Sequence, residues 1–194
     1  MNLSEFKNKH PHESIIVCGL GESVKALEKT RLGITIGVND IGRLFQPTYL
    51  LNVNNKNQYK GDRFSYIENS EAQALFTHQP EQQGNVKIPI VKLTLDPRVG
   101  AVDIIDDRIP HYRTTPYMAV SVAAYMGAKK IGLIGVDLTE NHFWIKDGPH
   151  RLIRELDAID KQFGKLAEHL RTKGVELWNL SPISKLTQLP RKTL

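Results

Sequence analysis

Short apolar stretches alternate with polar, glycine-containing stretches along most of the chain, and the apolar ones have the length and the β-branched content of buried strands. Predicted strands cover residues 15–18, 33–38, 49–53, 86–95, 130–136 and 175–179, with a shorter candidate at 74–77. Residues 130–136 are apolar on both faces, which is typical of a strand inside a parallel sheet. The pattern therefore predicts a buried, largely parallel sheet.

Helical patterns lie between the predicted strands. A first helix is expected to follow Ser23, beginning with residues 24–27. Thr115 and Pro116 suit the N-cap and the first position of a second helix over residues 117–126, which has almost no polar face and should be buried. Apolar residues recur at steps of four and three between residues 151 and 172, which predicts an amphipathic helix.

This alternation predicts an α/β fold, a single Rossmann-like domain with a mostly parallel sheet and helices on both faces. The domain is expected to cover residues 14–190, after a flexible N-terminal segment, residues 1–13, and before a basic tail, residues 191–194. A chain of 194 residues is long enough for one domain with its own core. Residues 143–148, which include two aromatic side chains, are expected to form a lid.

Charge and composition restrict the partners and the compartment. The formal net charge of +5 suits an anionic ligand, but Lys and Arg are scattered among acidic residues, so no nucleic-acid partner is expected. The single cysteine, Cys18, excludes an intramolecular disulfide and lies inside the first predicted strand. No stretch approaches the ~20 apolar residues of a membrane span. We expect a cytoplasmic protein without a transmembrane segment, whose membrane contact would be peripheral.

The first predicted strand ends in the loop Gly19-Leu20-Gly21-Glu22-Ser23. A strand, a glycine-rich loop and a helix can place backbone N–H groups where they bind a phosphate, although such turns also occur for steric reasons alone. The loop does not match the dinucleotide-binding pattern, because its third glycine would fall at Val24 and Asn39 replaces the acidic residue after the second strand. The phosphate loop of nucleoside triphosphatases is also absent.

Polar residues follow several of the predicted strands. Asn39 ends the second strand, Asn52 and Asn54 surround the end of the third, and Asp137 follows the strand over residues 130–136. Asn and Asp favour turns in general, but ligands of open α/β sheets bind outside the carboxyl ends of the strands. The buried helix begins near Thr115, which offers a second place for a phosphate or a carboxylate. A nucleotide or a nucleotide-sugar fits this set of groups.

Four separated segments resemble a Rossmann-like superfamily that includes the bacterial sialyltransferases using CMP-sialic acid, the motility accessory factors and the MptE-like 6-hydroxymethylpterin pyrophosphokinases. These segments are residues 16–23, 38–40, 128–137 and 174–184, in the same order as in the superfamily. The resemblance covers about residues 14–190. Glu22 departs from it, because loops of this superfamily often carry Pro at that position.

The resemblance implies a nucleotide site built from the first loop, the Asn after the second strand, the end of the third strand and the small polar pair that opens the buried helix. The nucleotide-binding residues implied in this way are Gly19, Leu20, Gly21, Ser23, Asn39, Asn52, Asn54, Thr114 and Thr115. Asp137 matches the acid that ends the Gly-x-Asp strand, and His150 matches a catalytic histidine before the penultimate helix. His142 competes with His150 as a base that takes a proton from an acceptor hydroxyl.

The expected function is sugar transfer from a nucleotide-sugar to a hydroxyl of a small or glycan acceptor, with no essential cofactor and no metal ligand. One alternative is MptE-like pyrophosphoryl transfer from ATP, in which Asp137 and loop acids would carry Mg²⁺. Another alternative is a non-catalytic nucleotide-binding module, because a fold does not fix a function. The donor, the acceptor and the oligomeric state stay open at this point.

Overall fold

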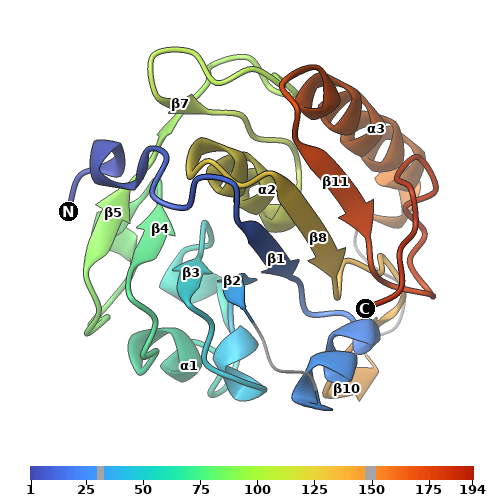
Figure 1. Cartoon of the computed structure of the whole chain (residues 1–194). Coiled ribbons are helices and arrows are strands. Elements are labelled where there is room, and N and C mark those ends of the chain that lie inside the picture. The colour runs from blue at the N-terminus through green and yellow to red at the C-terminus, as the bar shows by residue number, and fades with distance from the viewer. Residues whose placement is uncertain (30–32, 147–151) are drawn as a thin grey trace.

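The computed structural model describes residues 1–29, 33–146 and 152–194. Its centre is a seven-stranded sheet with the strand order β11-β8-β1-β2-β3-β4-β5 (Figure 1). All neighbouring pairs in this sheet are parallel. The strands are β1 (Ser14–Cys18), β2 (Ile34–Val38), β3 (Tyr49–Leu51), β4 (Leu75–Thr77), β5 (Ile90–Lys92), β8 (Lys130–Ile134) and β11 (Glu176–Asn179). This arrangement confirms the predicted α/β fold.

The order of the strands creates a reversal next to β1. From β1 the chain adds β2, β3, β4 and β5 on one side, and it then returns to place β8 and β11 on the other side. The last residue of β1, Cys18, is paired with Gly37 of β2 and Ile134 of β8. In open α/β sheets the crevice at such a reversal is where ligands bind.

Three α-helices and several 3₁₀ helices connect the strands. The α-helices are α1 (Ser65–Glu68), α2 (Thr115–Tyr125) and α3 (Leu156–Thr172). The 3₁₀ helices are η1 (Leu3–Phe6), η2 (Glu22–Lys29), η3 (Ile41–Arg43), η4 (Lys56–Gln58), η5 (Pro80–Gln82) and η6 (Ile153–Glu155). Helix α2 packs against β1, β2 and β8, and α3 packs against β11 (Figure 1). Tyr117 of α2 and Phe163 of α3 join the two helices with their ring centroids 5.3 Å apart.

Some elements differ from the prediction. The element after the glycine-rich loop, η2, is a 3₁₀ helix, and its buried Val24 and Leu27 are three residues apart, the period of that helix. The segment predicted as one strand over residues 86–95 is split into β5 and β6 (Thr94–Leu95). Pro89 has no N–H for a ladder, so the strand begins only after it. Strand β6 instead pairs with β7 (Arg108–Ile109) in a separate sheet.

The N-terminal segment packs against the domain, whereas we expected residues 1–13 to be flexible and separate. Phe6 is fully buried, and its ring lies 5.9 Å from that of Tyr49 and 4.9 Å from that of Phe76. The N–H groups of Asn8 and His10 donate to the carbonyls that end α2. The segment is therefore part of the core.

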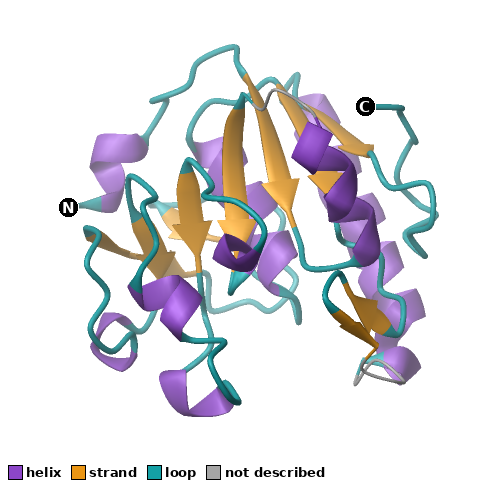
Figure 2. Cartoon of the chain, turned by 90° about the horizontal axis from the view of Figure 1, so that it is seen from below, coloured by secondary structure: helices purple, strands orange, loops and turns teal. Residues whose placement is uncertain are grey.

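Three further observations concern Cys18, the helices and the predicted lid. Cys18 is buried, as predicted, and burial raises the pKa of its thiol. Among the helices in the described ranges, none is long and apolar enough to cross a membrane. Residues 143–146 of the predicted lid form the turn and the second strand of a hairpin of β9 (Asn141–His142) and β10 (Ile145–Lys146), a two-stranded sheet apart from the main one (Figure 2). Residues 147 and 148 of the predicted lid lie outside the described residues.

Candidate functional site

A cavity of about 690 Å³ lies at the carboxyl ends of β1, β2, β3, β4 and β8. Its walls come from the loops that follow these strands, from the loop before α2 and from the first turn of α2. The cavity therefore occupies the crevice at the reversal of the strand order.

The structure brings many of the predicted site residues to this cavity. The lining includes Leu20, Gly21, Asn39, Asn54, Thr114, Thr115, Asp137 and His142. Gly19, Ser23 and Asn52 are not among the lining residues. His150 lies outside the described residues.

The carboxylate of Asp137 fills the place where a bound anion was expected. Ser23 donates to it twice, from its backbone N–H to Oδ2 at 2.9 Å and from its hydroxyl to Oδ1 at 2.6 Å. The hydroxyl of Ser181 donates to the same Oδ1 at 2.6 Å. Asp137 is only 1% exposed. This carboxylate thus joins the glycine-rich loop to the end of β8 and to the segment after β11.

The N–H groups of the two loop glycines are also engaged by the protein. Gly19 donates to the carbonyl of Ile134, and Gly21 donates to that of Gly135, both at 2.7 Å. A Cβ atom on Gly21 would lie 2.4 Å from Oδ2 of Asp137, and one on Gly19 would lie 2.3 Å from the carbonyl oxygen of Gly135. The glycines allow close contact with the β8 end, so the structure favours the steric explanation of this loop over a phosphate cradle.

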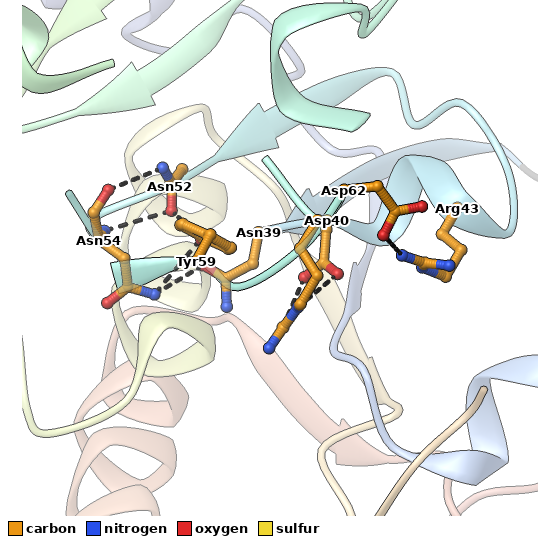
Figure 3. Close-up of polar contacts among 8 residues, drawn as sticks. Asn39, Asp40, Arg43, Asn52, Asn54, Tyr59 and Asp62 are labelled. Carbon is orange, nitrogen blue, oxygen red and sulfur yellow. Dashed lines mark hydrogen bonds and ion pairs between the residues drawn. The ribbon is translucent and has the colours of Figure 1, made fainter. Parts of the chain in front are cut away.

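An amide cluster of Asn39, Asn52 and Asn54 lies at the carboxyl ends of β2 and β3 (Figure 3). The hydroxyl of Tyr59 donates to Oδ1 of Asn52 at 2.6 Å, and Nδ2 of Asn54 donates to Oδ1 of Asn39 at 3.3 Å. Asn52 is fully buried, and its side chain donates to the carbonyl of Asn54 at 3.0 Å and accepts from the N–H of Asn54 at 3.2 Å, so it fixes the backbone of Asn54. Asn39 has a φ of 51°, a conformation that Asn tolerates, and its amide nitrogen points away from the cluster (Figure 3).

A buried ion pair places a cation on the same wall. Asp40 is fully buried and accepts from Nε and Nη2 of Arg63 at 2.9 and 2.8 Å. This pairing raises the pKa of Arg63, whose side chain is 30% exposed and lines the cavity. Its guanidinium also lies 5.5 Å from the ring centroid of Tyr59 and 5.1 Å from that of Trp144. The pair uses Nε and Nη2, so Nη1 remains for a ligand.

The N-terminus of α2 lines the cavity as well. Thr114 is its N-cap residue, one position earlier than predicted, and makes no side-chain capping bond. The hydroxyl oxygens of Thr114 and Thr139 are buried and have no hydrogen-bond partner among the described residues. Arg113 also lines the cavity and pairs with Glu155. A helix N-terminus whose N-cap hydroxyl has no partner in the described part of the chain is suited to an anionic ligand group.

The β9–β10 hairpin is attached to the glycine-rich loop. The N–H of Phe143 donates to the carbonyl of Leu20 at 2.8 Å, and Nδ2 of Asn141 donates to the carboxylate of Glu22 at 3.2 Å. The rings of His142 and Trp144 lie 4.8 Å apart. Glu22, which departs from the superfamily pattern, therefore helps to hold the hairpin over this end of the cavity.

Several lining residues were not singled out as site residues from the sequence. They are Tyr59, Arg63, His78, His111, Arg113 and Thr139. Arg63 and Tyr59 lie far along the chain from their partners Asp40 and Asn39, so no local pattern indicates them. Within residues 1–29, 33–146 and 152–194, no group of three or more His, Cys, Asp or Glu side chains is arranged to hold a metal ion.

No protein-family model and no curated protein matches the sequence. Solved structures do match, and glycosyltransferases are among them. The MAf glycosyltransferase from Magnetospirillum magneticum superposes with a TM-score of 0.57 at 12% identity, over 98% of this chain and 37% of that protein. The sialyltransferase CstII from Campylobacter jejuni gives 0.54 at 14% identity, over 95% of this chain and 86% of CstII. Cst-I from the same organism gives 0.53 at 14% identity, over 93% and 80% of the two chains.

This chain has a glycosyltransferase-like fold. The likeness agrees with the predicted resemblance to sialyltransferases at the level of the fold, and it gives no specific support to the pyrophosphokinase branch. The chain spans 37% of the length of the MAf glycosyltransferase. Structures of CstII contain CMP and a trisaccharide acceptor.

Proposed function

We propose that this chain is a glycosyltransferase-like enzyme that binds a nucleotide-sugar and transfers the sugar to a hydroxyl of a small or glycan acceptor. The observation that carries the proposal is the cavity at the reversal of the strand order, which combines an amide wall with the N-terminus of α2, where the Thr114 hydroxyl has no partner among the described residues. The complex of the fold neighbour CstII with CMP and a trisaccharide acceptor supports the same ligand class.

The nucleoside would bind at the amide cluster. Asn39 and Asn54 each carry a carbonyl acceptor and two N–H donors, which suit the hydroxyls of a ribose and the polar edge of a base. The Tyr59 hydroxyl contacts both amide side chains, and the buried Asn52 accepts from the backbone N–H of Asn54, so little order would have to be created on binding.

The phosphate would bind between the N-terminus of α2 and Arg63. The helix dipole and the hydroxyls of Thr114 and Thr139 favour an anion there, and Nη1 of Arg63 can donate to it. In this proposal the glycine-rich loop does not bind the phosphate and has a structural role, because the N–H of Ser23 already donates to Asp137.

The reaction is a displacement at the anomeric carbon of the donor. The oxygen of the acceptor hydroxyl forms a bond to this carbon, the bond from the carbon to the phosphate oxygen breaks, and the nucleotide leaves with the electron pair. The hydroxyl proton passes to a histidine. His142 lines the cavity beside Gly21, and the superfamily resemblance implies His150 for the same task.

Pyrophosphoryl transfer from ATP is less well supported. In that alternative Asp137 would hold Mg²⁺, but its two oxygens already accept three hydrogen bonds from Ser23 and Ser181. Mg²⁺ at this buried carboxylate would compete with the contacts that attach the glycine-rich loop. No metal ion has a part in the proposed sugar transfer.

A transfer assay tests the proposal. Purified protein is incubated with CMP-, UDP- or GDP-linked sugars and a panel of mono- and disaccharide acceptors, and the released nucleotide is quantified by chromatography. We expect release that depends on both the donor and the acceptor. His142→Gln and His150→Gln should identify the base, because one of them should lower the rate without weakening donor binding. Binding of donors with no turnover would instead support the non-catalytic module.

A further inference from the structure

The indole of Trp144 contacts two arginines that are distant from it in the chain. The guanidinium carbon of Arg63 lies 5.1 Å from its ring centroid, and that of Arg43 lies at the same distance. Both distances fall within the ~6 Å range of cation–π contacts. Trp144 belongs to the turn between β9 and β10, so these contacts attach the hairpin to both arginines.

The contact with Arg63 spans the part of the sheet where the cavity lies. The hairpin follows β8, whereas Arg63 follows β3. In the sheet β8 and β3 are three strand spacings apart, roughly 14 Å, with β1 and β2 between them. The hairpin therefore reaches past the carboxyl ends of β1 and β2 to contact Arg63.

The guanidinium of Arg63 is held at one edge and by two rings. Asp40 accepts from Nε and Nη2 at 2.9 and 2.8 Å, which fixes that edge. The ring of Tyr59 lies 5.5 Å away and that of Trp144 5.1 Å away, which restricts rotation about the fixed edge. Because the group is planar, these contacts also set the direction of Nη1, which takes no part in the bonds to Asp40.

We propose that Trp144 is a positioning residue for Arg63, holding its guanidinium so that Nη1 donates to the phosphate of a bound nucleotide. Trp144 is not among the residues that line the cavity, whereas Arg63 is, so Trp144 acts through Arg63. The inference rests on the proposed function for the identity of its ligand. Recognition of the phosphate should therefore depend on the hairpin, and recognition of the nucleoside should not.

A purely structural role of Trp144 predicts a different result. Its second cation, Arg43, pairs with the exposed Asp62 at 2.7 Å and is not among the lining residues. If Trp144 only anchored the hairpin, its loss would lower stability without any preference for ligands that carry a phosphate. The ratio of nucleotide to nucleoside affinity separates the two roles, because the nucleoside part is common to both ligands.

Isothermal titration of the full-length protein at pH 7.5 measures this ratio with the pairs cytidine and CMP, uridine and UMP, and guanosine and GMP. Trp144→Leu should lower the ratio about fivefold, and Trp144→Phe, which keeps an aromatic ring, should restore most of it. Trp178→Leu is the matched control, because Nζ of Lys192 lies 5.2 Å from the Trp178 ring and this tryptophan does not line the cavity. The control should leave the ratio unchanged.

Two further measurements test the connection through Arg63. Once Arg63→Gln has removed the guanidinium, Trp144→Leu should have no additional effect on the ratio. In Trp178→Phe, Trp144 is the one tryptophan left in the chain, and CMP should change its fluorescence more than cytidine does. The fluorescence measurement keeps Trp144 in place, so it does not depend on the folding of its variants.

The outcomes separate this inference from the proposed function. If nucleotides bind and Trp144→Leu leaves the ratio unchanged, or if the effects of Trp144→Leu and Arg63→Gln are additive, the inference is wrong and the proposed function stands. A lowered ratio without transfer of any sugar would support the inference and overturn the proposed transfer. If no nucleotide binds, both are wrong.

Discussion

The side chain of Asp137 shows how a single residue can replace a ligand. Its carboxylate accepts hydrogen bonds from Ser23 and Ser181, and it is shielded from solvent. The sequence of the loop resembles an anion-binding turn, but in the structure the N–H and the hydroxyl of Ser23 donate to a carboxylate of the protein itself. The glycines of the loop are required by this contact, because a Cβ at Gly21 would meet the carboxylate at 2.4 Å.

Substitution of Gly21 tests this contact. Gly21→Ala should lower the free energy of unfolding by about 1–3 kcal/mol, because the added methyl group displaces the carboxylate from Ser23. Gly33→Ala is the matched control, since a Cβ there would meet nothing within 4 Å, and it should change stability by less than about 0.5 kcal/mol. Urea denaturation measures both. Equal effects of the two substitutions would contradict the close contact at Gly21.

The lowered pKa of the Asp96 carboxyl group makes the free energy of unfolding depend on pH in acid. Hydrogen bonds from the side chain and the N–H of Arg98 lower the pKa of Asp96 from 3.8 to about 2. Because the folded pKa lies below the unfolded one, this group stabilises the protein above pH 4, and its contribution is lost as the pH falls from about 4 to 2. Asp96→Asn and Arg98→Ala should both flatten the pH dependence of the unfolding free energy in that window. The exposed Lys165→Ala should leave the slope unchanged.

At the scale of elements, helix α2 combines structural and binding roles. Its body is buried against β1, β2 and β8, while its first turn opens into the cavity. Thr114 at the N-cap makes no capping bond, and its hydroxyl has no partner among the described residues. This is an unusual use of an N-cap threonine, which ordinarily satisfies the first N–H groups of a helix.

Substitution of Thr114 should separate stability from binding. Thr114→Val keeps the shape of the side chain and removes a buried hydroxyl, so stability should stay the same or rise by up to about 1 kcal/mol. Affinity for a nucleotide-sugar should fall about tenfold, because one hydrogen bond to the phosphate is lost. Thr94→Val in the exposed part of β6 is the control, with no change in affinity. A loss of stability with unchanged affinity would assign Thr114 a capping role only.

The elements also show what could be predicted from local sequence. Most strands of the main sheet were predicted because each is a contiguous apolar run that ends in polar or turn-forming residues. The ends of β2 and β3 and the N-terminus of α2 bring Asn39, Asn54 and Thr114 into one site. The hairpin contacts of Glu22 and Phe143 could not be predicted, because each joins residues more than 100 positions apart in the chain.

At the scale of the whole molecule, the interior extends beyond the Rossmann-like domain boundary expected from the sequence. Leu3 and Phe6 are buried, and the ring of Phe6 contacts aromatic residues of β3 and β4. The local signal was weak because two apolar residues among many polar ones do not define an element. Arg63 was missed for a similar reason, since its partner Asp40 is 23 positions away.

Truncation of Phe6 tests the role of the N-terminal segment. Phe6→Ala should destabilise the whole domain by about 3–5 kcal/mol, the usual cost of removing a buried aromatic side chain. Val99→Ala is the control, because this side chain is 66% exposed and should contribute little. Thermal and urea unfolding both report the effect. If the segment were flexible, the two variants would have the same free energy of unfolding.

The central claim is that the cavity at the reversal of the strand order binds a nucleotide-sugar through the amide cluster. Isothermal titration of the wild-type protein with CMP-, UDP- and GDP-linked sugars tests it most directly, with Asn54→Ala as the site variant and Asn57→Ala as the control, an exposed Asn in the same loop that does not line the cavity. We predict saturable binding of at least one donor, weakened at least tenfold in Asn54→Ala and unchanged in Asn57→Ala. No saturable binding of any donor, or equal binding in wild type and Asn54→Ala, would contradict the account.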